Sequence, residues 1–262
     1  MSVIAQAIML AFSGGGVAPP GEVVFNAAGT ISWTVPAGVF EVSVVTVGGG
    51  NGHAANDTLT GTGTSYFKDA ATCVGYGSKG RFGGSFVGDG GGVGGSGGLG
   101  YVWTVAGYAD DYIGGGGGGA GGYAGTGGNG QGAGPSQTSN GYGGGGVGIF
   151  GQGASGGAAS GQSGTVGTGG AAGGGAAGMG ANAIGSYGKA GSNGTNGGYG
   201  VPGVYGGGMV GMGDAAGGGG LGWRNKIAVT PGQVITIKVG IGGAVRVMWG
   251  GNRSFPLNAA AI

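Results

Sequence analysis

Charge is the scarcest property of this sequence. Its 262 residues include only eight acidic and nine basic side chains, which give a formal net charge of +1. Proteins that bind nucleic acid through its phosphates carry a marked basic excess, so we expect no nucleic-acid partner. Disordered chains combine low hydrophobicity with high net charge. This chain is nearly neutral and 39% hydrophobic, and its composition therefore predicts an ordered protein.

Cysteine, histidine and long apolar runs are also scarce. Cys73 and His53 are single residues of their types, which excludes a disulfide within the chain and a cysteine- or histidine-rich metal site. No apolar run reaches the ~18 residues of a membrane-spanning helix, so we expect no membrane insertion. GxGxxG matches are numerous, but 85 glycines produce them by chance. We therefore expect that the protein has no enzymatic activity and binds no metal and no cofactor.

Glycine takes the place of these residues and follows a period. It occupies every third position from Gly185 to Gly206, and shorter blocks with the same period lie between Gly88 and Gly173. A period of three matches the polyproline-II-type helix, which has three residues per turn. Collagen shares this period but needs far more than the seven prolines present. The pattern predicts polyglycine-II helices stacked side by side, with turns where the period slips.

Near both ends of the sequence, apolar and polar residues alternate as they do in β-strands. Residues 31–35 and 42–47 do so near the beginning, and residues 234–239 and 244–249 near the end. The first two segments predict a β-hairpin or part of a small sandwich. The predicted fold class is mainly β plus non-regular structure, with almost no α-helix. A small β-sandwich or sheet is built from both chain ends, and a large polyglycine-II helix bundle is inserted into it.

Four segments follow from this division. They are an N-terminal attachment segment (1–20), a β-rich module (21–82), a glycine-rich polyglycine-II sandwich (83–220) and C-terminal strands that complete the β module (221–262). The first segment is apolar and is either a core strand or short helix, or a patch that attaches to a partner protein. The candidate attachment residues are Ile4, Ile8, Met9, Leu10 and Phe12.

Residues 101–113 interrupt the glycine-rich region with aromatic side chains and a pair of carboxylates. One interpretation is a strand or hairpin packed on the glycine bundle. The other is a binding loop, because aromatic rings and carboxylates suit the recognition of carbohydrate or of a protein surface. The candidate receptor-binding residues are Tyr101, Trp103, Tyr108, Asp110, Asp111 and Tyr112.

The two ends of the chain resemble glycine-rich bacteriophage virion and tail proteins. The segments that carry this resemblance are residues 31–38 (ISWTVPAG), 42–50 (VSVVTVGGG), 219–233 (GGLGWRNKIAVTPGQ), 243–249 (GAVRVMW) and 253–256 (RSFP). The middle is similar in style to the tip adhesins of long tail fibres, in which a sandwich of polyglycine-II helices presents loops to a bacterial receptor. Here a β block follows the glycine region, so the loop layout of those adhesins does not transfer.

The resemblance implies a tail-associated adhesin, located in the virion tail, that recognises the host surface through loops. Its implied partners are other virion or tail proteins, through the N-terminal segment or the β module, and a host surface protein or glycan. Self-association is left open. The alternatives are a structural tail or capsid component without receptor binding, or an extracellular glycine-rich structural or ice-binding protein.

A far-UV circular dichroism melt distinguishes a packed glycine region from a disordered one. We expect a polyproline-II signature at low temperature that disappears in a cooperative transition, because stacked helices lose their mutual hydrogen bonds together. A polyproline-II signal that fades gradually, with no transition, would contradict the packed bundle.

Overall fold

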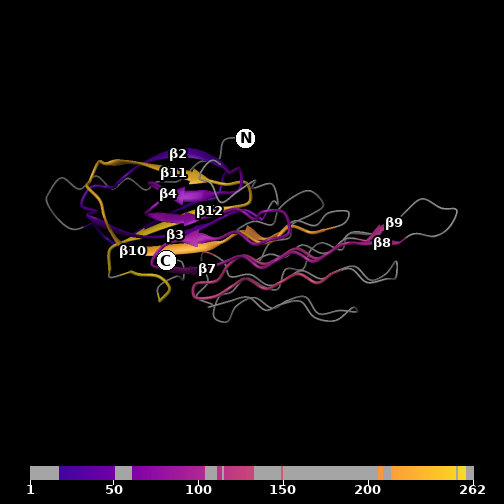
Figure 1. The fold of residues 1–262 in the computed structure, drawn as a ribbon. Helices are drawn as coiled ribbons and strands as arrows, with labels where there is room; N and C mark the ends of the chain where they lie inside the picture. Colours follow the sequence, from indigo (N-terminus) through magenta and orange to yellow (C-terminus); the bar gives the residue numbers. More distant parts are fainter. Residues whose placement is uncertain are drawn as a thin grey trace.

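The computed structural model describes residues 18–50, 61–103, 111–113, 115–132, 149, 206–208, 214–251 and 253–257. Within these ranges the chain forms β-strands, turns and extended segments, and no α-helix is present. The prediction of a mainly β protein is therefore confirmed. In Figure 1 the longer strands gather at one end of the molecule, and extended glycine-rich segments run from them toward the other end.

Two five-stranded antiparallel sheets form the β module. Sheet A has the order β1 (Gly21–Phe25), β12 (Ala244–Trp249), β3 (Glu41–Val47), β10 (Leu221–Ala228) and β7 (Gly90–Gly92). Sheet B has the order β2 (Gly29–Thr34), β11 (Val234–Val239), β4 (Ser65–Phe67), β5 (Cys73–Gly75) and β6 (Phe86–Val87). A separate ribbon contains β8 (Tyr101–Trp103) and β9 (Asp111–Ile113).

Strands from near the two ends of the chain pair with each other in both sheets. In sheet A, β12 lies between β1 and β3, and in sheet B β11 pairs with β2. Of the two arrangements predicted for residues 31–47, the sandwich is confirmed and the hairpin is wrong. β2 and β3 belong to different sheets because the turn at residues 35–40 carries the chain from one sheet to the other.

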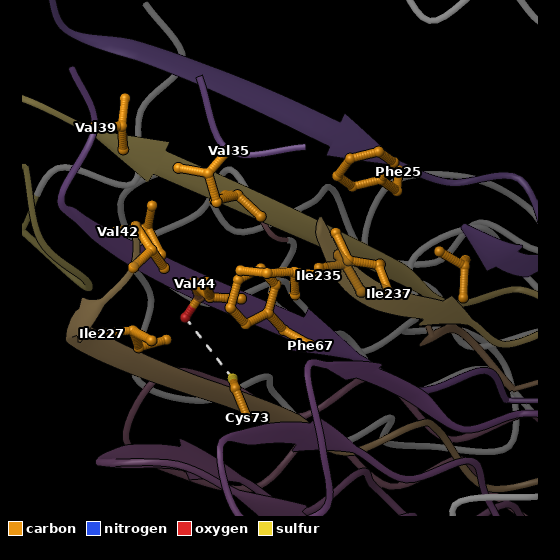
Figure 2. Packing of buried hydrophobic residues seen from close by; sticks show 14 residues of the cluster. Phe25, Val35, Val39, Val42, Val44, Phe67, Cys73, Ile227, Ile235 and Ile237 are labelled. Atoms are coloured by element: carbon orange, nitrogen blue, oxygen red, sulfur yellow. Dashed lines mark hydrogen bonds between the residues drawn. The ribbon is translucent and has the colours of Figure 1, made fainter. Parts of the chain in front are cut away.

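The core between the sheets follows from strand alternation. Ile235 and Ile237 of β11 belong to the same buried cluster as Val42 and Val44 of β3 (Figure 2). Val239 of β11 belongs to this cluster as well. Alternate residues of a strand lie on opposite faces, so each strand gives one apolar row to this core. Burying a side chain of this size stabilises the fold by about 1.5–3 kcal/mol.

Sheet A is buried on its second face as well. Val45 and Val47 of β3 and Met248 of β12 form another cluster with Tyr123 and Ile149 from the glycine-rich region. β10 contributes to both faces, because a register shift between Arg224 and Ile227 inserts one extra residue and reverses the alternation. Sheet A is therefore the middle of three layers.

Hydrogen bonds between glycine-rich segments recur every third residue. Residues 93–98 bond through their backbone to residues 81–84, 116–119, 127–130 and 215–218, at N···O distances of 2.7–3.0 Å. Two bonds join each pair of segments, and they lie three residues apart along the chain. A strand in a sheet has only two hydrogen-bonding neighbours. Residues 93–98 have four such neighbours, so they belong to a packed bundle of extended segments of the chain.

Glycine is required in this bundle by the closeness of neighbouring backbones. A Cβ added at Gly95 would overlap the carbonyl oxygen of Gly128, and one at Gly118 would overlap that of Gly95. The same holds for Gly98 and Gly121, which gives stripes with a spacing of three residues. Each of these positions has a carbonyl oxygen where any other residue would place its side chain.

Substituting alanine at Gly95 tests this packing. The Cβ would force two backbones apart, and overpacking of this kind costs about 1–3 kcal/mol. We expect Gly95→Ala to lower the urea midpoint accordingly. Gly132→Ala is the matched control, because the nearest atom to its Cβ is the Leu99 oxygen at 3.4 Å, an ordinary contact. Equal midpoints for the two variants would contradict the packing described here.

Candidate functional site

The candidate receptor-binding residues fall on the β8–β9 ribbon. The structure places Tyr101 and Trp103 on β8, and Asp111 and Tyr112 on β9. Figure 1 shows this ribbon near the end of the glycine-rich segments that is remote from the two sheets. Tyr108 and Asp110 lie outside the described residues, as does the whole set of candidate attachment residues: Ile4, Ile8, Met9, Leu10 and Phe12.

The register of the ribbon brings an aromatic residue and a carboxylate residue together. Trp103 is the cross-strand partner of Asp111, and Tyr101 is the partner of Ile113. Cross-strand partners share one face of an antiparallel pair, and alternate residues share it too. These four positions therefore belong to one face of the ribbon. Residues 102 and 112 belong to the other.

The base of the ribbon is fixed by hydrogen bonds from the glycine-rich segments. The Gly100 amide donates to the Asp214 carboxylate at 3.0 Å, and the Gly98 amide donates to the Gly116 carbonyl at 2.8 Å. Leu99 lies between these two bonds and is half exposed, at 52%. The ribbon is thus held at its base by neighbouring extended chain, with an apolar side chain beside it.

A second cluster, the joint, connects the glycine-rich region to the β module. It contains Tyr123 and Ile149 from the glycine-rich region and Arg246, Trp223 and Phe255 from the module. The Tyr123 and Phe255 rings stack with centroids 5.9 Å apart. The Trp223 indole donates to the Tyr123 carbonyl at 2.8 Å, and the Tyr123 hydroxyl donates to the Ile149 carbonyl at 3.0 Å. Aromatic stacking and buried hydrogen bonds both fix the orientation of the two parts.

A buried arginine is the centre of this joint. Arg246 is completely buried, and its guanidinium donates to Glu22 at 2.7 Å and to the Ile149 carbonyl at 3.0 Å. Arg253 donates to the same Glu22 oxygen at 2.6 Å. Burial raises the pKa of Glu22, but the hydrogen bonds and charges of the two arginines outweigh it, so this pKa lies below its usual value.

Sequence reasoning did not identify this joint. Arg246 interrupts the apolar run of residues 244–249, and that interruption is the one signal that the sequence contains. In a one-sided sheet, position 246 would be an ordinary solvent-facing residue of an alternating strand. Its burial depends on the third layer, and alternation within one strand does not reveal a layer formed by distant residues such as Ile149, which is 97 positions away.

The remaining chemistry of the described residues is sparse. Burial raises the pKa of the Cys73 thiol to about 12, so this thiol is protonated at neutral pH and a poor nucleophile. Within the described ranges there is no group of three or more histidine, cysteine or acidic residues suited to a metal ion. Nor does any helix in that part of the chain have the length and apolarity to cross a membrane.

Comparison of the chain with protein-family models, with curated proteins and with solved structures finds no match.

The joint predicts a pH-dependent stability. Glu22→Gln leaves two arginines without an ionised partner, and breaking a buried pair in this way costs about 3–5 kcal/mol at pH 7. Because the native pKa of Glu22 is lowered, its contribution is complete above the unfolded-state pKa and is lost as pH falls through the native pKa. The difference between wild type and variant in urea unfolding should therefore narrow below about pH 4.

Asp89→Asn is the matched control for Glu22→Gln. The Asp89–Arg224 pair is 3.2 Å long but partly exposed, so we expect its loss to cost no more than about 1 kcal/mol. Equal costs for the two variants at pH 7, or a Glu22→Gln cost that does not change with pH, would contradict the role given to Glu22.

Proposed function

We propose that the chain is a bacteriophage tail-associated adhesin that recognises the host cell surface through loops on a polyglycine-II sandwich. The β8–β9 ribbon is the recognition element in this proposal, and a surface protein or glycan of the host is its ligand. The observation that carries the proposal is the position of the ribbon. Its aromatic and acidic residues interrupt a glycine-rich bundle at the end remote from the module where both chain ends pair.

The polyglycine-II assignment is itself part of the proposal. It is supported by the three-residue recurrence of hydrogen bonds and by the four neighbours of residues 93–98. A helix with three residues per turn directs successive amides in three directions around its axis, so it can bond to neighbours on several sides. It is also supported by the glycine stripes at the same spacing. The stretch 185–205, where the period is longest in sequence, lies outside the described residues.

The composition of the bundle suits a scaffold that presents a ligand-binding loop. Between Asp111 and Asp214 the sequence contains one charged residue, Lys189. Few side chains are available for recognition within such a bundle, so recognition would depend on the interruptions. Aromatic residues that sit on a rigid support lose little conformational entropy on binding, which favours them as contact residues.

The β module would serve as the attachment side in the virion tail. It contains paired strands from near both ends of the chain, β1 and β12, and lies away from the ribbon (Figure 1). In this proposal the module or residues 1–20 contact other virion or tail proteins. A structural tail component without receptor binding, and an extracellular glycine-rich or ice-binding protein, remain as outcomes of the experiment below.

The test is binding of the purified full-length chain, carrying a fluorescent label, to intact cells and envelope fractions from a panel of bacteria. We expect saturable binding to a subset of strains. A Trp103→Ala, Tyr108→Ala double variant should lose at least about 30-fold in affinity, because each aromatic contact at the centre of an interface is worth about 1–2 kcal/mol or more. Phe40→Ala is the control, since this aromatic is 62% exposed and lies on the β module. Its binding should not change.

Three results would count against the proposal in different ways. Saturable binding that the double variant retains would remove the ribbon as the recognition element. An absence of binding to every strain would favour a structural component, and thermal hysteresis of the same sample in an ice-growth assay would favour the ice-binding alternative.

A further inference from the structure

Among the residues that the structure describes, one edge of sheet B is unpaired and uncharged. β2 pairs with β11 along one side, and no described residue pairs with its other side. Gly29, Thr30, Ser32 and Thr34 are exposed. Natural proteins protect such edges with charged residues, proline, bulges or short strands. The sequence of β2, GTISWT, contains none of these protections over six residues.

The other three sheet edges are protected. β1 contains the charged residue Glu22, and the Arg253 side chain donates to the Gly21 carbonyl at 3.1 Å. β6 has only two residues. β7 consists of three glycines and leads directly into the bonded glycine-rich segments. The exposure of β2 is therefore an exception within this module.

Two hydrogen bonds fix the direction of the backbone groups along the open edge. The Val35 amide donates to the Gln233 carbonyl at 2.9 Å, toward β11. The Thr236 carbonyl, opposite Ser32, accepts from the Lys68 amide on the far side of β11. Groups alternate in direction along an antiparallel strand. The amides and carbonyls of Thr30, Ser32 and Thr34 therefore point outward, where a further strand would bond to them.

The edge is complementary to itself about Ser32. In an antiparallel pairing of two β2 strands centred there, Thr30 of one copy would lie opposite Thr34 of the other, and Ser32 opposite Ser32. On the inner face, Trp33 of one copy would lie opposite Ile31 of the other. Hydroxyl pairs and aromatic–β-branched pairs are both favourable cross-strand combinations. Both Trp33 and Ile31 are only partly buried in the single chain, so this pairing would cover their remaining surface.

We propose that β2 is a dimerisation edge, on which a second copy of this chain adds its own β2 in antiparallel orientation around Ser32. The pairing joins two copies of sheet B into one continuous sheet. It is isologous, so each copy uses its open edge once and the assembly closes at two chains. Because no charged residue lies on the edge, like charges do not meet across the two-fold axis of the dimer. The dimer does not depend on the ligand proposed for the ribbon.

Sedimentation equilibrium of the full chain tests the dimer. We expect a concentration-dependent species of twice the chain mass of 24.0 kDa. Ser32→Pro removes an outward amide without touching the β11 ladder, so it should raise the dimer dissociation constant at least about tenfold. Ser32→Lys should do the same by placing two ammonium groups across the axis. Thr236→Lys is the matched control, because it lies on the same exposed face but one strand away from the edge.

Cysteine cross-linking tests the register. Ser32→Cys should form an intermolecular disulfide under mild oxidation, because directly opposed residues of a hydrogen-bonded pair lie about 5.5 Å apart at Cα. Thr30→Cys should not form this disulfide, since the two copies of residue 30 lie four residues apart along the paired β2 strands, about 13 Å. The native Cys73 is buried and does not compete. A chain that stays monomeric, a dimer unaffected by Ser32→Pro and Ser32→Lys, or equal cross-linking at residues 30 and 32 would overturn the proposal.

Discussion

The structure depends on one constraint: backbone amides and carbonyls that leave water must find partners. In the β module the sheets supply these partners through strand pairing. In the glycine-rich region the partners of one segment come from several neighbouring segments of the same chain, at intervals of three residues. This arrangement requires backbones to approach more closely than a Cβ permits, which is why glycine occupies the stripes that include Gly95, Gly98 and Gly118.

A related constraint, the cost of burying a charge without partners, acts on the middle sheet of the β module. Sheet A has an apolar cluster on each face, one shared with sheet B and one with Tyr123 and Ile149. A strand buried on both faces has no solvent side on which to place a charge. Arg246 is nevertheless there, and its guanidinium is matched by Glu22, the Ile149 carbonyl and the Phe255 ring. The joint thus couples the orientation of the glycine-rich segments to the module by directional contacts.

Sequence alone predicted the parts of the fold that local patterns encode. Alternation over residues 42–47, 234–239 and 244–249 identified strands that the structure confirms, and the two ends of the chain do pair. The sequence did not predict which strands pair, because the same alternation fits a hairpin between β2 and β3 or the sandwich that forms. The bulge in β10 and the burial of Arg246 arise from contacts between distant segments, and no local pattern records them. Of the candidate site, the sequence identified the interruption at residues 101–113, and the structure adds the pairing of Trp103 with Asp111.

The strands that border the glycine-rich region are neighbours in space. β7 leads into the region, β10 leads out of it, and Gly92 of β7 pairs directly with Leu221 of β10. The region is therefore an insertion that begins and ends at two adjacent strands of sheet A. Pairs of outgoing and returning segments can be gained or lost without moving either border strand. The number of segments in the bundle can therefore change while the two border strands keep their register.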